Sequence, residues 1–241
     1  MVIIMKPSLP TLLSFNGGYV DTAGYIALQG LFTAHVTGNF VTIGSALVFG
    51  TSGVVAKLLA LPVFCAVIII TRLASFHLPR NRSALHTMLT VKLVLLMLGA
   101  YLAIRLGPFV NGDTWSAILT GMTLVSATAI QNAVHRIDLG TAPPTTLMTG
   151  TTTQMMIDIA DVIRGLSPET QDATLGRLRH MAVAVLTFAF GAAAAAYLFG
   201  QLGSWCFVVP PMVALAARLS ANSTQAAPPL RLAAPLSRPF S

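Results

Sequence analysis

The sequence predicts an all-α, polytopic integral membrane protein, a helical bundle that crosses a lipid bilayer about six times. Hydrophobic residues make up 55% of the 241 positions and charged residues only 9%, and the mean hydropathy is +0.77. A soluble domain carries roughly 25% charged residues, because its surface has to be hydrated. A chain this poor in charge cannot cover a water-soluble globule, whereas it can satisfy a surface that faces lipid.

Six apolar segments reach, or nearly reach, the roughly 20 residues that a helix needs to cross the hydrocarbon core. Residues 1–14 are expected to form a short N-terminal cytoplasmic segment. Residues 220–241, rich in Ala, Pro and Ser, are expected to form a disordered cytoplasmic tail. Residues 15–219 then make a single transmembrane domain. Its predicted spans cover residues 15–32, 55–76, 86–106, 115–134, 181–199 and 205–219.

Two further segments, residues 35–50 and 143–162, are too short or too polar to cross the bilayer alone and too apolar to be solvated loops. Each contains a Thr-Gly pair followed by an amphipathic run. Aligning the two pairs predicts a weak internal repeat, in which each half reads as span, Thr-Gly segment, span, span. Weak internal symmetry of this kind is a mark of transporter folds. The repeats cover residues 15–106 and 115–219, approximately.

The positive charges fall between the predicted spans, where a membrane protein keeps the Lys and Arg residues that set its orientation. Six spans with both termini in the cytoplasm place these arginines on one side. The two Thr-Gly segments must then be re-entrant or parts of broken helices, and the two halves are inverted. The net charge of +7 does not indicate nucleic-acid binding, because the charges do not cluster into one face. The arginines concerned are Arg80, Arg82, Arg136, Arg164, Arg177, Arg179, Arg218, Arg231 and Arg238.

Asp21 lies within the first predicted span, where a carboxylate is costly and is normally paired or functional. Two interpretations stay open, a structural pair or a proton or cation site. Lys92 in the third span is the obvious candidate for the partner of Asp21, although it could equally extend to the cytoplasmic interface. The spacing between Asp21 and His35 is expected to place them at opposite ends of one span, which argues against a catalytic pair.

The Thr-Gly segments form the second polar feature of interest. A Thr or Asn side chain there can cap the first turn of a helix, and Gly permits the turn before it. Such a half-helix would direct free N–H groups toward the protein interior. The alternative is close helix packing through Gly and Thr. The expected capping residues are Thr37 or Asn39, on either side of Gly38, and Thr149 or Thr151, on either side of Gly150.

Other polar residues are candidates by position alone. Gln131 and Asn132 lie near the end of the fourth predicted span, and Asp161 and Arg164 are expected to pair at the cytoplasmic surface. The histidines are too scattered to suggest a metal site, and no cofactor is expected. The candidate substrate- or ion-binding residues are Asp21, His35, Thr37, Gly38, Asn39, Lys92, Gln131, Asn132, Thr149, Gly150 and Thr151.

Two pairs of motifs resemble those of a known family. NGGYVDTAGYIAL followed by LFTAHVTGNFVTIG, and later IQNAVHRIDLG followed by PTTLMTGTTTQ, are similar to the paired motifs of the YoaK family, bacterial inner-membrane proteins grouped as a domain of unknown function. The resemblance covers approximately Leu12 to Ala217. It implies a small polytopic protein of the bacterial inner membrane and supplies no substrate. Thr151 stands where Asn usually follows Thr-Gly in this family, so a role for an amide there is in doubt.

The sequence favours a carrier or channel for a small solute, in which Asp21 senses protons or cations and the two Thr-Gly segments line a site. The expected partners are the lipid bilayer and a small solute or proton, and the oligomeric state, including a homo-oligomer, stays open. One alternative is a structural or assembly protein without transport activity. Another is an intramembrane enzyme that uses Asp21 with His35, or Gln131 with His135, although the sequence contains no catalytic signature.

Overall fold

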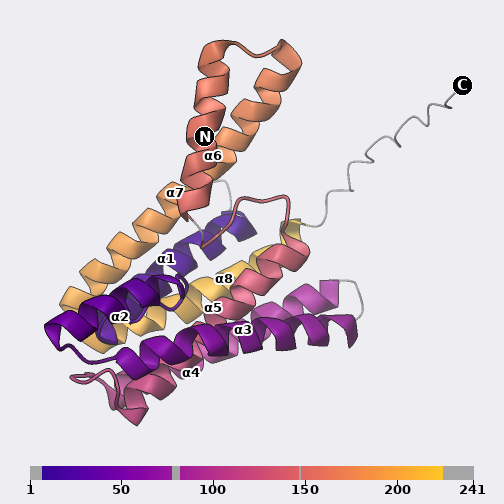
Figure 1. Ribbon diagram of the computed structural model, residues 1–241. Helices are drawn as coiled ribbons and strands as arrows, with labels where there is room; N and C mark the ends of the chain where they lie inside the picture. The colour runs from indigo at the N-terminus through magenta and orange to yellow at the C-terminus, as the bar shows by residue number, and fades with distance from the viewer. Residues whose placement is uncertain (1–6, 78–81, 147, 225–241) are drawn as a thin grey trace, which may run out of the picture.

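The computed structural model describes residues 7–77, 82–146 and 148–224. This part of the chain is helical and contains no strand, which confirms the all-α prediction (Figure 1). In chain order the helices are α1 (Leu9–Ala27), α2 (Gly38–Phe49), α3 (Val54–His77), α4 (Arg82–Leu106), α5 (Trp115–Asp138), α6 (Met148–Arg164), α7 (Pro168–Leu202), the 3₁₀ helix η1 (Gly203–Val208) and α8 (Val209–Thr224).

Three of the helices, α3, α4 and α5, begin and end within about four residues of predicted spans. Four stretches of the described chain are long and apolar enough to cross a membrane: α3, most of α4, α5, and residues Thr170–Ala221, which include parts of α7 and α8 and the whole of η1. A helix of about 20 apolar residues matches the thickness of the hydrocarbon core. The helices therefore have the lengths that a bundle embedded in a bilayer requires.

The two ends of the chain are more helical than predicted. α1 begins at Leu9 rather than at residue 15, because Ser8 caps it and accepts a hydrogen bond from a first-turn N–H. α8 continues to Thr224, so the start of the expected disordered tail is helical. The remainder of the predicted terminal segments, residues 1–6 and 225–241, lies outside the described residues.

Two apolar clusters define the two ends of the bundle. One joins the starts of α1 and α4 to the ends of α5 and α8, and the other joins the opposite ends of the same helices. Consequently α1 and α4 run antiparallel to α5 and α8. The first cluster includes Leu13, Leu89, Val134 and Ala217, and the second includes Leu28, Phe109, Ala117 and Phe207.

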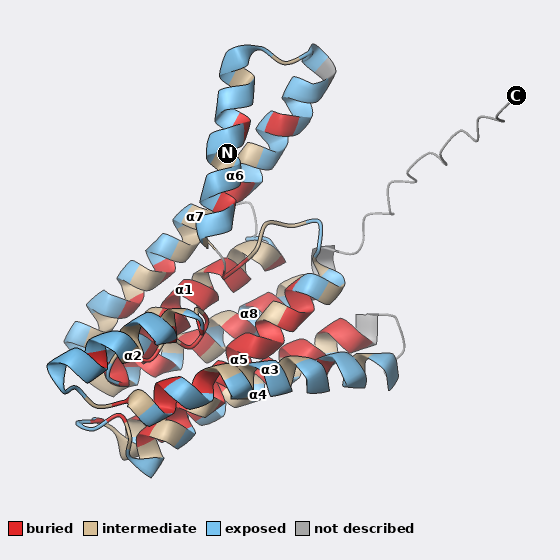
Figure 2. Ribbon diagram, in the orientation of Figure 1, coloured by how far each residue is buried: buried red, intermediate tan, exposed pale blue. Residues whose placement is uncertain are grey.

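Hydropathy and burial vary in opposite directions among α3, α4 and α5. The apolar 18-residue stretch of α3 has a mean hydropathy of 2.6 with 22% of its residues buried, whereas that of α5 has 1.3 with 72% buried. Figure 2 shows buried residues along α5 and α1 and exposed ones along the outer side of α3. A helix that faces lipid needs apolar side chains outward, while a central helix can carry polar groups that its neighbours satisfy. The polar side chains of α1 and α5 therefore point into protein.

Contact between α1 and α7 depends on two glycines. A Cβ on Gly18 would clash with the backbone carbonyl of Phe188, and a Cβ on Gly191 would clash with the backbone carbonyl of Phe15. Small residues let the backbones of membrane helices approach closely. This crossing places the middle of α7 beside the middle of α1, about one turn before Asp21.

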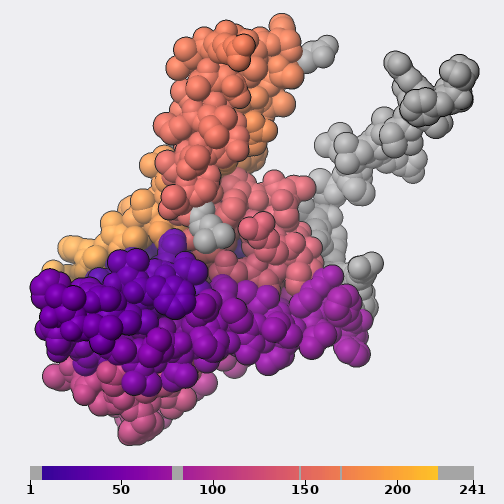
Figure 3. Space-filling view, in the orientation of Figure 1, coloured from indigo at the N-terminus to yellow at the C-terminus, as the bar shows by residue number. Residues whose placement is uncertain are grey.

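A helical hairpin formed by α6 and the first half of α7 projects beyond the bundle (Figure 1 and Figure 3). Asp158, buried between the two helices, accepts hydrogen bonds from Nε and Nη2 of Arg177, both at 2.7 Å. These bonds hold the pKa of Asp158 below its usual range. The expected pair of Asp161 with Arg164 is not found among the ion pairs of the described residues. Asp158 pairs with Arg177 instead, because the packing of α6 on α7 brings together residues that are 19 apart in the chain.

Candidate functional site

The backbone is interrupted between α1 and α2, where residues 28–37 are not helical. α1 ends at Ala27, five residues before the predicted end of the first span. The reason is local, because Gln29 and Gly30 have φ angles of 55° and 82°, which no right-handed helix contains. These residues make the turn that was expected at Gly38, whose own φ is not in the left-handed region.

The chain then runs back into the bundle and meets Asp21. Oδ1 of Asp21 accepts the backbone N–H groups of Thr33 at 2.8 Å and Ala34 at 2.7 Å, and Oδ2 lies 2.7 Å from Nδ1 of His35. Asp21 is only 4% exposed, so this carboxylate is fully hydrogen-bonded where it is buried. Asp21 lies about 9 Å along α1 from Ala27, at 1.5 Å per residue.

Two expectations about Asp21 are therefore wrong. Asp21 and His35 are not at opposite ends of a span, because the chain reverses after Ala27 and returns His35 to the level of Asp21. Lys92 is not the partner of Asp21. Its ammonium is buried in α4 and forms no hydrogen bond with any described residue, whereas the partners of Asp21 come from residues 33–35.

Two further buried side chains fix the same non-helical stretch. The amide of Asn39 pairs with the backbone of Phe32, accepting its N–H at 2.8 Å and donating to its carbonyl at 2.9 Å. The hydroxyl of Thr128 on α5 donates to the carbonyl of Thr33 at 2.6 Å. Asn39 thus bonds backwards across the break, and Thr37, which precedes α2, forms no side-chain capping bond. Residues 32–35 are held by α1, α2 and α5 together.

The connection between α5 and α6 is held in a similar way. Nε2 of Gln131 donates to Oγ1 of Thr145 at 3.0 Å and to the carbonyl of Leu13 at 2.9 Å. Oδ1 of Asn132 accepts the hydroxyl of Thr146 at 2.6 Å. Both threonines are buried. Polar side chains near the end of one helix again bind the chain that follows it.

The second Thr-Gly pair lies inside a helix, whereas it was expected to cap the start of one. Thr149, Gly150 and Thr151 are within the first turn of α6, which begins at Met148. Thr149 and Gly150 are exposed and Thr151 is buried. Gly150 does not have a positive φ, and a Cβ there would meet open space. Its backbone therefore needs no glycine.

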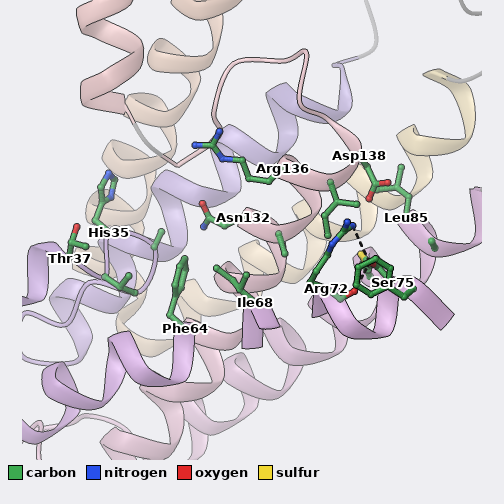
Figure 4. A pocket seen from close by; sticks show the side chains of 17 residues that line it. His35, Thr37, Phe64, Ile68, Arg72, Ser75, Leu85, Asn132, Arg136 and Asp138 are labelled. Carbon is green, nitrogen blue, oxygen red and sulfur yellow. Dashed lines mark hydrogen bonds between the residues drawn. The ribbon is translucent and has the colours of Figure 1, made fainter. Parts of the chain in front are cut away.

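A cavity of about 1230 Å³ adjoins the break between α1 and α2. Figure 4 shows His35 and Thr37 at one end of it, Asn132 and Arg136 along α5, and Arg72 and Asp138 toward the other end. The first Thr-Gly segment reaches the cavity directly, and the second reaches it through Asn132, which binds Thr146. The described residues that line it are Ala34, His35, Val36, Thr37, Phe64, Ile68, Arg72, Ser75, Phe76, Ala84, Leu85, Met88, Asn132, Ala133, Arg136, Ile137 and Asp138.

Several lining residues were not predicted as site residues. Arg136 was expected only as one of the charges between predicted spans, and Arg72 was not among the candidate site residues. The spacing of the lining residues is the signal that could have found them. Asn132 and Arg136 are four residues apart on α5. Phe64, Ile68 and Arg72 follow one another at intervals of four residues on α3. Residues at that spacing share one face of a helix. What the spacing does not reveal is that the two faces meet.

These features define a class, a multi-pass helical membrane protein with a non-helical break after its first helix and a half-open, partly polar cavity lined by that break and by α3, α4 and α5. The family follows from a match over residues 9–220. The chain belongs to the family described as protein of unknown function (DUF1275), in agreement with the resemblance to YoaK-like proteins. Neither a curated protein nor a solved structure matches the chain.

Proposed function

We propose that the protein is a carrier for a small solute in the bacterial inner membrane, with six crossings and both termini in the cytoplasm. α1 and α4 run in one direction and α5 and α8 in the other, which supports this topology. Arg72, Arg136 and Arg218 also support it, because they lie near the end of the bundle that contains the cluster around Leu13. Cytoplasmic loops carry the excess of Lys and Arg.

The two halves, α1 to α4 and α5 to α8, are inverted repeats in this proposal. Each contains a helix, a non-helical connection, a shorter helix, a long helix and a last helix. The polar bonds across the connections support the pairing, because Asp21 and His35 are 14 residues apart, as are Asn132 and Thr146. Inverted repeats with interrupted helices near the middle of the membrane are found in several carrier folds, where they surround the substrate site.

Asp21 couples protons to the cavity in this mechanism. Its carboxylate binds residues 33–35, and His35 forms part of the cavity wall. Protonation of the carboxyl would remove the charge that the amide N–H groups of Thr33 and Ala34 stabilise. The segment at the cavity wall would then loosen. This single contact, a buried carboxylate that binds a cavity-lining histidine, carries the proposal, since ionisable groups inside a membrane mark ion and proton pathways.

The test is transport by the purified protein in proteoliposomes. A panel of amino acids, sugars, organic acids and amines is added under an imposed pH gradient, with labelled-solute uptake and an internal pH dye as readouts. We expect uptake of at least one solute with movement of protons, and a loss of roughly tenfold or more in Asp21→Asn. Asp161→Asn, at an exposed position in α6, is the matched control. If no solute of the panel enters, the carrier proposal is abandoned.

A second candidate function is an intramembrane enzyme, favoured by one observation. Asp21 and His35 meet the geometric requirement of a catalytic pair, 2.7 Å apart with the histidine beside a cavity. Gln131 and His135 do not, because Nδ1 of His135 has no partner among the described residues. Hydrolysis of a p-nitrophenyl ester by the purified protein, abolished in His35→Gln, would favour the enzyme over the carrier.

A further inference from the structure

The charges that line the cavity are predominantly positive. Arg72 and Arg136 contribute two positive charges and Asp138 one negative charge, which leaves one net positive charge with His35 neutral. Neither arginine forms an ion pair within the described residues, and the Asp138 carboxylate interacts with Arg72 electrostatically from a longer distance. Two guanidinium groups at one cavity disfavour a cationic ligand and favour an anionic one.

Arg72 is held at the wall by its neighbours on α3. Its guanidinium carbon lies 4.4 Å from the centre of the Phe76 ring, and Nη1 donates to Oγ of Ser75 at 3.5 Å. The hydrogen bond occupies one of five N–H donors. These two contacts orient the guanidinium along α3, and its planar donors match the two oxygens of a carboxylate.

Apart from Thr37, Ser75 and Asn132, the remainder of the cavity wall is apolar. Phe64 and Ile68 on α3, Leu85 and Met88 on α4, and Val36 in the break all form part of its wall. A volume of about 1230 Å³ exceeds what an inorganic anion fills. Sites with apolar walls and a few polar groups typically bind ligands that bury an apolar body and orient a polar head.

We propose that this cavity binds an organic monoanion, with an apolar body against α3 and α4 and an anionic head at Arg72 and Arg136. The assignment deepens the proposed function, because it names the substrate class of the same site. His35, which binds Asp21, then lies at the end of the cavity away from Arg72, with Arg136 between them (Figure 4). The carrier would accept organic anions and reject cations of equal size.

Calorimetric titration of the protein in phosphatidylcholine nanodiscs tests the assignment, with empty nanodiscs as reference. The probes are 2-naphthoate, 2-naphthylmethanol and 2-naphthylmethylammonium, which share one ring system and differ in head-group charge. We expect naphthoate to bind tightest and the cation not to bind. Arg72→Gln and Arg136→Gln should each raise the Kd of naphthoate about tenfold, with the Kd of naphthylmethanol unchanged.

Arg105→Gln is the matched control, because Arg105 is an exposed arginine on α4 that does not line the cavity. Binding of naphthylmethanol by each variant reports that the cavity is folded. Equal binding of all three probes, or arginine variants that bind naphthoate like Arg105→Gln, would overturn the assignment. Repeating the titration with phosphatidylglycerol present separates two sources of the anion. A raised Kd assigns the site to a lipid head group, and an unchanged Kd to a soluble anion.

The two proposals fail separately. Uptake of only neutral or cationic solutes, without naphthoate binding, removes the anion assignment and retains the carrier. Naphthoate binding that depends on Arg72 and Arg136, without uptake of any solute, retains the anion site and removes the carrier.

Discussion

Asp21 holds the break after α1 in place, and the carrier proposal gives the same carboxylate a second role in proton coupling. Its carboxylate replaces the water that would otherwise hydrogen-bond the backbone of residues 33–35. The hydrogen bonds from the backbone N–H groups require only an oxygen acceptor at position 21, whereas proton coupling requires a carboxylate that can be protonated. Asn keeps an acceptor and removes the charge, so the two roles can be separated by substitution.

Asp21→Ala should lower the free energy of unfolding by about 3 kcal/mol, because it leaves buried N–H groups without an acceptor. Asp21→Asn should cost less than half of that, since its carbonyl can still accept from Thr33 and Ala34. Melting of the purified variants in detergent measures both. Equal losses for the two variants would mean that the charge, rather than the acceptor, holds the break.

Lys92 is the opposite case, a buried ammonium with no hydrogen-bond partner among the described residues. Lys92→Met should raise the free energy of unfolding by about 2 kcal/mol, because an apolar chain of similar length avoids the cost of burying a charge. Lys57→Met is the matched control. Lys57 is equally buried, but Nζ donates to the carbonyl of Ser52, so no gain is expected. A less stable Lys92→Met protein would indicate that the ammonium binds a ligand or water.

Among the elements, the α1–α7 crossing should tolerate substitution least. Gly18→Ala and Gly191→Ala should each destabilise the protein by about 2 kcal/mol or more, because the added methyl meets a backbone carbonyl that cannot rotate away. Gly200→Ala, also on α7 but facing open space, should be neutral or stabilising by up to about 1 kcal/mol. Melting curves of the three variants distinguish a packing requirement from a general intolerance of Ala.

The α6–α7 hairpin should be sensitive to pH through Asp158. The pKa of Asp158 is lowered by Arg177 in the folded state, so the ionised pair stabilises the hairpin above the unfolded-state pKa of about 3.9. That stabilisation is lost as the pH falls through the lower, folded-state pKa. Hydrogen exchange of α6, corrected for intrinsic rates, should show full protection at pH 6 and reduced protection near pH 3.

Asp158→Asn should reduce the protection of α6 at pH 6 and remove this part of its pH dependence. Asp161→Asn, one turn away and exposed, should behave like the unsubstituted protein. Similar pH profiles for the Asp158→Asn variant and the unsubstituted protein would contradict the role of the pair.

For the whole molecule, the proposed topology places the α2–α3 turn outside and the tip of the hairpin in the cytoplasm. In a background of Cys65→Ser and Cys206→Ala, Thr51→Cys should react with an impermeant maleimide in intact cells. Ser167→Cys should react only after the membrane is opened. Both positions are exposed. Labelling of both from the same side would exclude six crossings.

The long helices could be predicted closely because their signal is local. The apolar runs of α3, α4 and α5 are set by the requirement to face lipid over about 20 residues. The ends of α1 were misplaced, since Ser8 and the φ angles of Gln29 and Gly30 fixed them rather than hydropathy. The α6–α7 hairpin was also missed as a projecting unit, because its ion pair joins residues on two different helices.

Composition and apolar runs by themselves determined that this is an all-helical membrane protein, and the first Thr-Gly pair indicated that the helical pattern is interrupted between Asp21 and α3. Each helix that faces lipid needs its own run of consecutive apolar residues, so these features can be recognised from short stretches of sequence. Only the tertiary structure decided that His35, rather than Lys92, binds Asp21, and that Arg72 and Arg136 line one cavity with it. These contacts join residues far apart in the chain, and only the packing of whole helices brings them together.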